Sequence, residues 1–246
     1  MLVKVADSVL LAIDEAIEMP LALERLSRST NYSRNESLPV TAVDSEYDPK
    51  AMSLYWSAKT ASSMPLIQFL AYYQVIEFYF DRYWKKDTWK AMRKVLEHPR
   101  FDPYSDSDIG RLFRAANVNP NPKDRALRPS ERVRLKATIQ ECVTLYDLRS
   151  FIVDSEDRQR FFGSNRAKRI SRRTISIGDM SSYSLDHREE AAERLSDIRN
   201  RIVHAREGQE PLLPSAPEIG DLRHDIDLVE FLARKVLRAS ASPLRV

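Results

Sequence analysis

Glycine and cysteine are both scarce in this chain of 246 residues. It contains 5 glycines, roughly a third of the number that average usage would give. Gly-rich phosphate loops, dinucleotide-binding fingerprints and β architectures with many turns need glycine at positive φ. The shortage therefore argues against these classes. The single cysteine, Cys142, excludes both an internal disulfide and a zinc site built on cysteines.

The chain also lacks a long hydrophobic run. Its first apolar stretch, MLVKVADSVLLAIDEAIEM, is interrupted by Lys4, Asp7, Asp14 and Glu15. No apolar run reaches the ~18 residues that a membrane span requires, and no signal peptide is recognisable. We therefore expect a soluble, cytoplasmic protein. The net charge of +3 is a mild basic excess, which is compatible with nucleic-acid binding without being evidence for it.

Helical periodicity dominates what the sequence does contain, and no convincing strand alternation is present. Residues 28–49 are rich in Ser, Asn, Asp and Pro and have no periodicity, which predicts a linker. We therefore predict an all-α fold, with a helical extension and linker over residues 1–45 and a helical domain over residues 46–246. Residues 3–27 are predicted to form one helix, or two short helices broken near Pro20. Further helices are predicted over 50–63, 64–84, 87–97, 106–116, 130–152 (with Ser130 as N-cap), 187–206 and 217–240.

The stretch RLSDIRNRIVHAREG, residues 194–208, carries an arginine and a histidine within an amphipathic helix. At about 100° per residue, one apolar arc is formed by Ala191, Ala192, Leu195, Ile198, Ile202 and Val203. Arg199 lies inside this arc, whereas Asn200 and His204 lie on the opposite face, one turn apart. A guanidinium directed into a core cannot lose its proton, so Arg199 needs a polar partner.

Glu77 is the best candidate partner for Arg199, because it lies in the mostly apolar helix predicted over 64–84. It shares a stripe there with Tyr73, Gln74 and Asp81, at spacings of three and four residues. On this spacing alone, the alternative interpretation is a structural salt bridge together with a solvent-facing histidine.

A basic segment, RQRFFGSNRAKRISRRT, connects the helices before residue 158 and after residue 174. Two interpretations stay open. The cations could track phosphates while bases stack on Phe161 and Phe162, or the segment could be a solvated, partly irregular loop. The cations concerned are Arg158, Arg160, Arg166, Lys168, Arg169, Arg172 and Arg173. The other histidines, His98, His187 and His224, have no metal-ligand spacing, so no metal site is predicted.

An arginine, four residues and a histidine form a pattern that resembles the motif of HEPN domains, which are helical-bundle proteins. The string LSDIRNRIVHA is similar to the ApeA-type branch of that family, and PLIQFLAYYQVIEFYF and DIDLVEFLARKVL resemble the helices before and after its motif. The resemblance covers roughly residues 50 to 240. Two departures stand beside the motif: Ala205 replaces a glycine that many relatives have, and Arg201 adds a charge.

The resemblance implies a metal-independent endoribonuclease that needs no cofactor, often a toxin or phage-defence effector. It also implies a homodimer that builds one composite site, and a possible antitoxin or defence-system partner. His204 would be the general acid and base, and Arg199 would bind the scissile phosphate or stabilise its developing charge. Asn200 would orient the phosphate or His204. Arg201 would join the basic segment in binding RNA.

Two questions stay open at this point. Arg199 and His204 diverge by ~140° on a regular helix, so they would converge through an irregular helix, through the reach of the arginine, or across a dimer. The chain could also be a catalytically inactive dimerisation module, or a partner subunit that docks nucleic acid through its basic segment.

Overall fold

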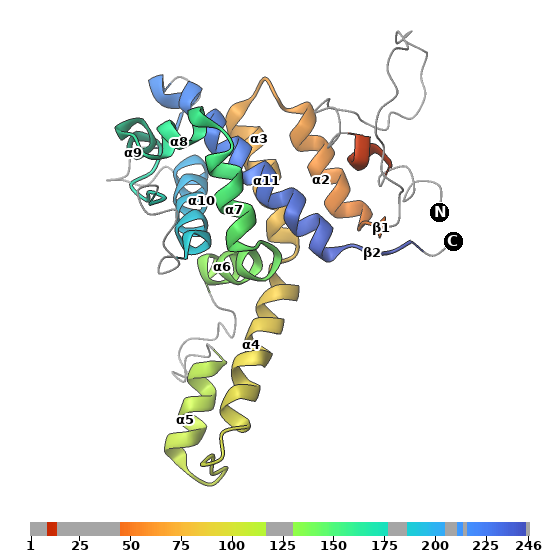
Figure 1. Ribbon diagram of the computed structural model, residues 1–246, viewed down its shortest axis with the longest axis vertical. Coiled ribbons are helices and arrows are strands. Elements are labelled where there is room, and N and C mark those ends of the chain that lie inside the picture. The colour runs from red at the N-terminus through yellow and green to blue at the C-terminus, as the bar shows by residue number, and fades with distance from the viewer. Residues whose placement is uncertain are drawn as a thin grey trace. The chain divides into compact units, whose positions relative to one another are not determined.

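The computed structural model describes residues 9–13, 45–116, 130–176, 186–204, 211–213 and 216–244 (Figure 1). The described residues are mostly helical, which confirms the predicted all-α class. The helices are α2 (Pro49–Thr60), α3 (Pro65–Phe78), α4 (Phe80–Leu96), α5 (Asp106–Ala115), α6 (Glu131–Cys142), α7 (Leu145–Val153), α8 (Glu156–Phe162), α9 (Asn165–Ile170), α10 (His187–Val203), the 3-10 helix η1 (Pro217–Leu222) and α11 (Arg223–Ser240). Within the described ranges, none of these helices is long and apolar enough to cross a membrane.

The chain divides into two compact units, one of residues 1–76 with 201–246 and one of residues 77–200. The first contains α2, most of α3, η1 and α11. Asp48 caps α2 by accepting a hydrogen bond from the N–H of Lys50 at 2.9 Å. Lys59 on α2 forms an ion pair of 2.9 Å with Glu230 on α11. Two-residue strands, β1 (Ser45–Glu46) and β2 (Ser242–Pro243), pair antiparallel, a feature that the sequence did not predict.

The second unit contains α4 to α9 and all but the last three residues of α10. Its α4 packs against both α6 and α5, and Figure 1 shows α5 beside the C-terminal part of α4, beyond α6. Short polar side chains begin four of its helices by accepting a backbone hydrogen bond. These caps are Ser130, Thr144, Ser155 and Ser164, so the predicted cap at Ser130 is confirmed.

The helix predicted over 64–84 is interrupted at Tyr79, and α4 absorbs the helix predicted separately over 87–97. Neither glycine nor proline marks this position. At the break, Tyr79 is buried and its ring meets that of Phe78 edge to face, with centroids 5.0 Å apart. Glu77 therefore lies in the last turn of α3 and Asp81 in the first turn of α4, so the two residues do not share the one continuous helix that was predicted.

The helix predicted over 130–152 is also two helices, α6 and α7, with Val143 in an extended conformation between them. The Thr144 hydroxyl accepts a hydrogen bond from the N–H of Asp147 at 3.0 Å, which favours a new helix start. At the end of α6, the Arg188 guanidinium donates to the carbonyls of Gln140 at 3.2 Å and Val143 at 3.3 Å. A partner distant in sequence thus stabilises the break.

The basic segment is more regular than predicted, because it contains α8 and α9. The motif helix α10 ends at Val203, shorter than the predicted end at residue 206. Residues 9–13 are helical, within the predicted N-terminal helix. Most of residues 1–45, the loop around Pro120 and Pro122, and Ala205 lie outside the described residues, so the boundary predicted near residue 45 stays a prediction.

Candidate functional site

Arg199 is held near the end of α10 by partners on either side. Its Nε lies 3.3 Å from Oε1 of Glu131, the first residue of α6. Its Nη1 donates to Oδ1 of the neighbouring Asn200, also at 3.3 Å. Both members of the ion pair are about a quarter exposed, with side-chain values of 20% for Arg199 and 27% for Glu131. Asn200 therefore holds the guanidinium of Arg199, whereas its predicted roles of orienting the phosphate or His204 stay predictions.

Glu77 lies within electrostatic range of the same group, as part of a cluster of charges. Burial raises the pKa of the Glu77 carboxyl above its usual range, and the negative charge of Glu131 raises it further. The positive charges of Arg199 and Arg134 pull the pKa of Glu77 in the opposite direction. The predicted interaction of Arg199 with Glu77 thus exists as an electrostatic one, whereas the ion pair with Nε of Arg199 is made by Glu131.

Arg134 extends this cluster towards the start of α4. Its Nη1 lies 3.4 Å from Oδ1 of Asp81, and its guanidinium lies over the ring of Phe80 at 5.5 Å. Two arginines and three carboxylates, Glu77, Asp81 and Glu131, therefore gather in the second unit. We call these five residues the charged cluster.

The other predicted supporting residues lie on α3 and differ from each other in exposure. Tyr73 is buried, and its ring stacks on that of Phe69 with centroids 6.4 Å apart. Gln74 is exposed. Tyr73 is therefore a core residue of α3.

His204 directly follows the end of α10 at Val203 and is half-buried. The divergence of ~140° expected between positions 199 and 204 holds only for a continuous helix. Since the last helical residue is Val203, the backbone at His204 is not bound by helical geometry. Asn200 is the last residue of the second unit, whereas His204 belongs to the first.

The fully buried arginine of α10 is Arg194 rather than Arg199. Arg194 is 0% exposed, and its Nη1 donates to the carbonyls of Ala167 at 3.1 Å and Arg173 at 2.8 Å. The rings of Phe161 and Phe162 lie 5.7 and 5.5 Å from its guanidinium. Sequence reasoning missed Arg194, although it is three residues after Ala191 and four before Ile198, on the apolar face.

The burial of these two phenylalanines corrects the base-stacking interpretation of the basic segment. Phe161 is 3% and Phe162 is 2% exposed, so neither ring can receive a base. Arg158 is also occupied within the protein, since its Nε donates to the carbonyl of Phe151 at 2.7 Å. Arg160 is exposed, but it pairs with Glu156 one turn earlier on α8. The other exposed cations of the segment are Arg166, Lys168, Arg169, Arg172 and Arg173, which we call the α9 cations.

Arg201 belongs to the first unit. Its Nη2 is 3.7 Å from Oε1 of Glu218 on η1, and its side chain is 15% exposed. Its carbonyl accepts a hydrogen bond from the N–H of Leu212 at 3.0 Å. Arg201 therefore has a structural partner in addition to the RNA-binding role that was predicted for it.

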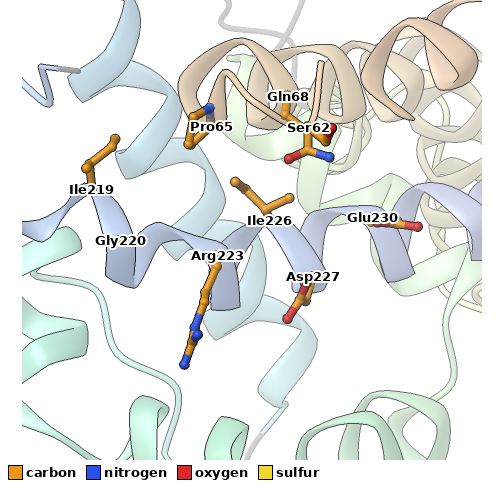
Figure 2. Close-up of a pocket in the computed structure, with 9 residues that line it drawn as sticks. All are labelled: Ser62, Pro65, Gln68, Ile219, Gly220, Arg223, Ile226, Asp227 and Glu230. Atoms are coloured by element: carbon orange, nitrogen blue, oxygen red, sulfur yellow. The ribbon is translucent and has the colours of Figure 1, made fainter. Parts of the chain in front are cut away.

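A cavity of about 220 Å³ lies in the first unit and contains none of the predicted site residues. Figure 2 shows Ile226 of α11 pointing towards Pro65 and Gln68 of α3, whereas Arg223 and Asp227 point away from α3. Glu230, which also lines the cavity, is paired with Lys59 at 2.9 Å and with Arg234 at 3.1 Å. Its carboxylate is therefore already compensated by protein cations.

Cys142 and His187 are chemically reactive residue types, but both are held inside the protein. Burial raises the pKa of the Cys142 thiol to about 11, so the thiolate needed for nucleophilic chemistry is scarce at neutral pH. His187 is fully buried, with Nδ1 3.2 Å from Oε2 of Glu190. Among the residues that the structure describes, no group of three or more His, Cys, Asp or Glu side chains could hold a metal ion.

Comparison of the chain with protein-family models, with curated proteins and with solved structures finds no match.

Proposed function

We propose that the chain is a metal-independent endoribonuclease of the HEPN type, with the helical-bundle fold of that family, acting as a toxin or phage-defence effector in the cytoplasm. The observation that carries the proposal is the end of α10. There, a partly exposed arginine is oriented by an amide and a carboxylate, and the helix stops immediately before the motif histidine. An oriented cation and an imidazole outside a helix suit phosphate binding and proton transfer.

In the proposed reaction, His204 removes the proton from a ribose 2′-hydroxyl, and the 2′-oxygen attacks the adjacent phosphorus. The bond from phosphorus to the 5′-oxygen breaks, and an imidazolium returns a proton to that oxygen. The products are a 2′,3′-cyclic phosphate and a 5′-hydroxyl. Neither an electron donor nor a metal ion enters this balance.

Arg199 would stabilise the charge that develops on the phosphate oxygens. A guanidinium has five N–H donors in a fixed plane. An ion pair through Nε with Glu131 can therefore orient the plane while a phosphate is bound through other donors. Asn200, which accepts from Nη1, would hold the plane from the opposite side.

A homodimer would complete the site by combining residues of two protomers. This arrangement can be tested by mixing two inactive variants, Arg199→Gln and His204→Ala. If each site takes its arginine from one protomer and its histidine from the other, a mixed dimer contains one intact site. We expect the mixture to regain activity that neither variant has alone. No recovery on mixing would contradict the composite site.

The experiment that tests the proposed activity is RNA cleavage in EDTA by the wild type and by His204→Ala. General acid–base catalysis contributes about 10²–10⁴-fold, so we expect at least a hundredfold loss in the variant, and cyclic phosphate ends in the wild-type products. His98→Ala is the matched control, because His98 is an exposed histidine in the connection after α4. Equal cleavage by His204→Ala, or intact RNA with the wild type, would contradict the proposal.

A second candidate function is a catalytically inactive module that dimerises or binds nucleic acid. The observation that favours it is the charged cluster itself, because Glu131 and Glu77 offset the positive charge that Arg199 would present to a phosphate. In this case, RNA binding would be measurable without cleavage, and the mixed dimer would stay inactive.

A further inference from the structure

The exposed tryptophan of α4 stands out on the second unit. Trp89 is 59% exposed, although a tryptophan side chain is among the most favourable to bury. It lies on a strongly basic helix, because α4 contains six cations and two acids: Arg82, Lys85, Lys86, Lys90, Arg93 and Lys94 against Asp81 and Asp87. The difference is +4, which exceeds the net charge of +3 for the whole chain.

Helical spacing brings part of this charge beside Trp89. Lys85 and Arg93 are four residues before and after it, and Arg82 and Leu96 are seven residues before and after it. Positions at these offsets fall within about 40° of Trp89 around the helix. All five side chains are exposed. They form a strip roughly 21 Å long, at 1.5 Å per residue, which we call the Trp89 stripe.

The ion pairs that α4 makes with α6 involve lysines outside the stripe, so the stripe keeps its positive charge. Glu141 of α6 pairs with Lys86 and, at 2.7 Å, with Lys90. The carboxylate of Glu141 thus compensates lysines that lie beside the stripe. Among the described residues, no carboxylate is ion-paired with Lys85 or Arg93. The aromatic ring is therefore flanked by cations whose charge a polyanion can neutralise.

A cationic track with an exposed aromatic ring suits a single strand of nucleic acid. The phosphates interact with the cations, and an unpaired base stacks on the ring. The α9 cations offer only the first of these contacts, because Phe161 and Phe162 beneath them are buried. Duplex RNA offers no free base face for stacking. The stripe thus fits an unpaired strand better than either a duplex or a neutral protein surface.

We infer that the Trp89 stripe binds single-stranded RNA, with one base stacked on Trp89 and phosphates contacted by Lys85 and Arg93. That the strand is RNA rests on the proposed function; the preference for an unpaired strand rests on the stripe itself. The stripe would hold the RNA on α4. Because stacking on Trp89 needs an unpaired base, the stripe would select single-stranded regions of the RNA.

The first test measures binding of a fluorescein-labelled oligouridylate of about 16 nucleotides, within the usual site sizes for single strands. All proteins carry His204→Ala, so the RNA stays intact and binding is read separately from cleavage. Trp89→Ala should weaken binding by roughly five- to 150-fold, the effect of losing one stacked base. Trp89→Phe keeps an aromatic face and should lose much less. Circular dichroism checks that both variants remain folded.

The second test removes charge from the stripe and from α9 in equal amounts. For single strands, each phosphate contact contributes about 0.7 to the slope of log affinity against log salt. Lys85→Gln with Arg93→Gln should reduce the slope by about 1.4. Lys168→Gln with Arg169→Gln removes the same charge from the α9 cations and should leave the Trp89 effect unchanged.

Three results would overturn the inference. These are unchanged binding by Trp89→Ala, equal affinity for duplex RNA, and binding only to vesicles of anionic lipid. The two proposals can also fail separately. A chain that binds oligouridylate through Trp89 but never cleaves RNA contradicts the nuclease proposal alone, whereas a chain that cleaves RNA equally well with Trp89→Ala and binds it unchanged contradicts the stripe alone.

Discussion

Nε of Arg199 lies 3.3 Å from Oε1 of Glu131, which joins the end of the motif helix α10 to the first residue of α6. The same two charges act in opposite directions on Glu77. Arg199 is therefore the centre of an electrostatic arrangement that exists whether or not the chain cleaves RNA. This arrangement can be measured without an activity assay, through the pKa of Glu77.

Replacing either charge should move the pKa of Glu77 in a defined direction. Glu131→Gln removes a negative charge and should lower the pKa of Glu77, whereas Arg199→Gln removes a positive charge and should raise it. The measurement is an NMR titration of the Glu77 carboxyl carbon in each variant. Shifts of the same sign in the two variants would contradict the arrangement.

The ion pair itself should add little stability, because both side chains are partly exposed. Glu131→Gln is expected to change the free energy of unfolding by less than about 1 kcal/mol.

Glu77 should make stability fall as pH rises. Its folded-state pKa is raised above the unfolded value, mainly by burial, so its contribution is complete below the unfolded pKa and is lost as pH rises through the folded pKa. As pH rises above the ordinary pKa of a glutamate, about 4.3, the wild type should lose unfolding free energy relative to Glu77→Gln. Urea denaturation across this range measures the difference.

Glu141 provides a control of opposite sign. Lys86 and Lys90 lower the pKa of its carboxyl, so its stabilising contribution is present above the unfolded pKa and is lost as pH falls through the folded pKa. Relative to Glu141→Gln, the wild type should gain stability as pH rises through the usual range of a glutamate. If the stability differences for Glu77→Gln and Glu141→Gln changed with pH in the same direction, the opposite pKa shifts of the two carboxyls would be contradicted.

Arg194 should be the arginine on which folding of the second unit depends most. Arg194→Met keeps much of the side-chain volume but leaves the carbonyls of Ala167 and Arg173 without this donor. Each buried acceptor left unsatisfied costs about 1–3 kcal/mol, so the loss of both should cost about 2 to 6 kcal/mol in urea denaturation. Arg172→Met, at an exposed neighbouring position, should stay within about 0.5 kcal/mol. Similar values for the two variants would contradict the buried role.

Local sequence patterns predicted much of the helical framework. The periodicity over 106–116 and the cap at Ser130 correspond to α5 and to the start of α6. The breaks at Tyr79 and Val143 could not be read from the sequence in the same way. Neither glycine nor proline marks Tyr79, and the carbonyl of Val143 accepts from the guanidinium of Arg188, 45 residues further along. The predicted exposure of Phe161 and Phe162 was wrong for a related reason. Whether a phenylalanine in a basic segment is buried depends on tertiary contacts, here with Arg194 of α10.

The sequence by itself determined that the chain is helical, that Arg199 needs a polar partner and that a basic excess is present, since these follow from periodicity, from the permanent charge of a guanidinium and from composition. Only the tertiary structure decided that Nε of Arg199 pairs with Glu131, that Arg194 is the buried arginine, and that the exposed aromatic ring among cations is Trp89. Each of these depends on which helices lie side by side, and contacts between residues far apart in the chain are not encoded in any local pattern.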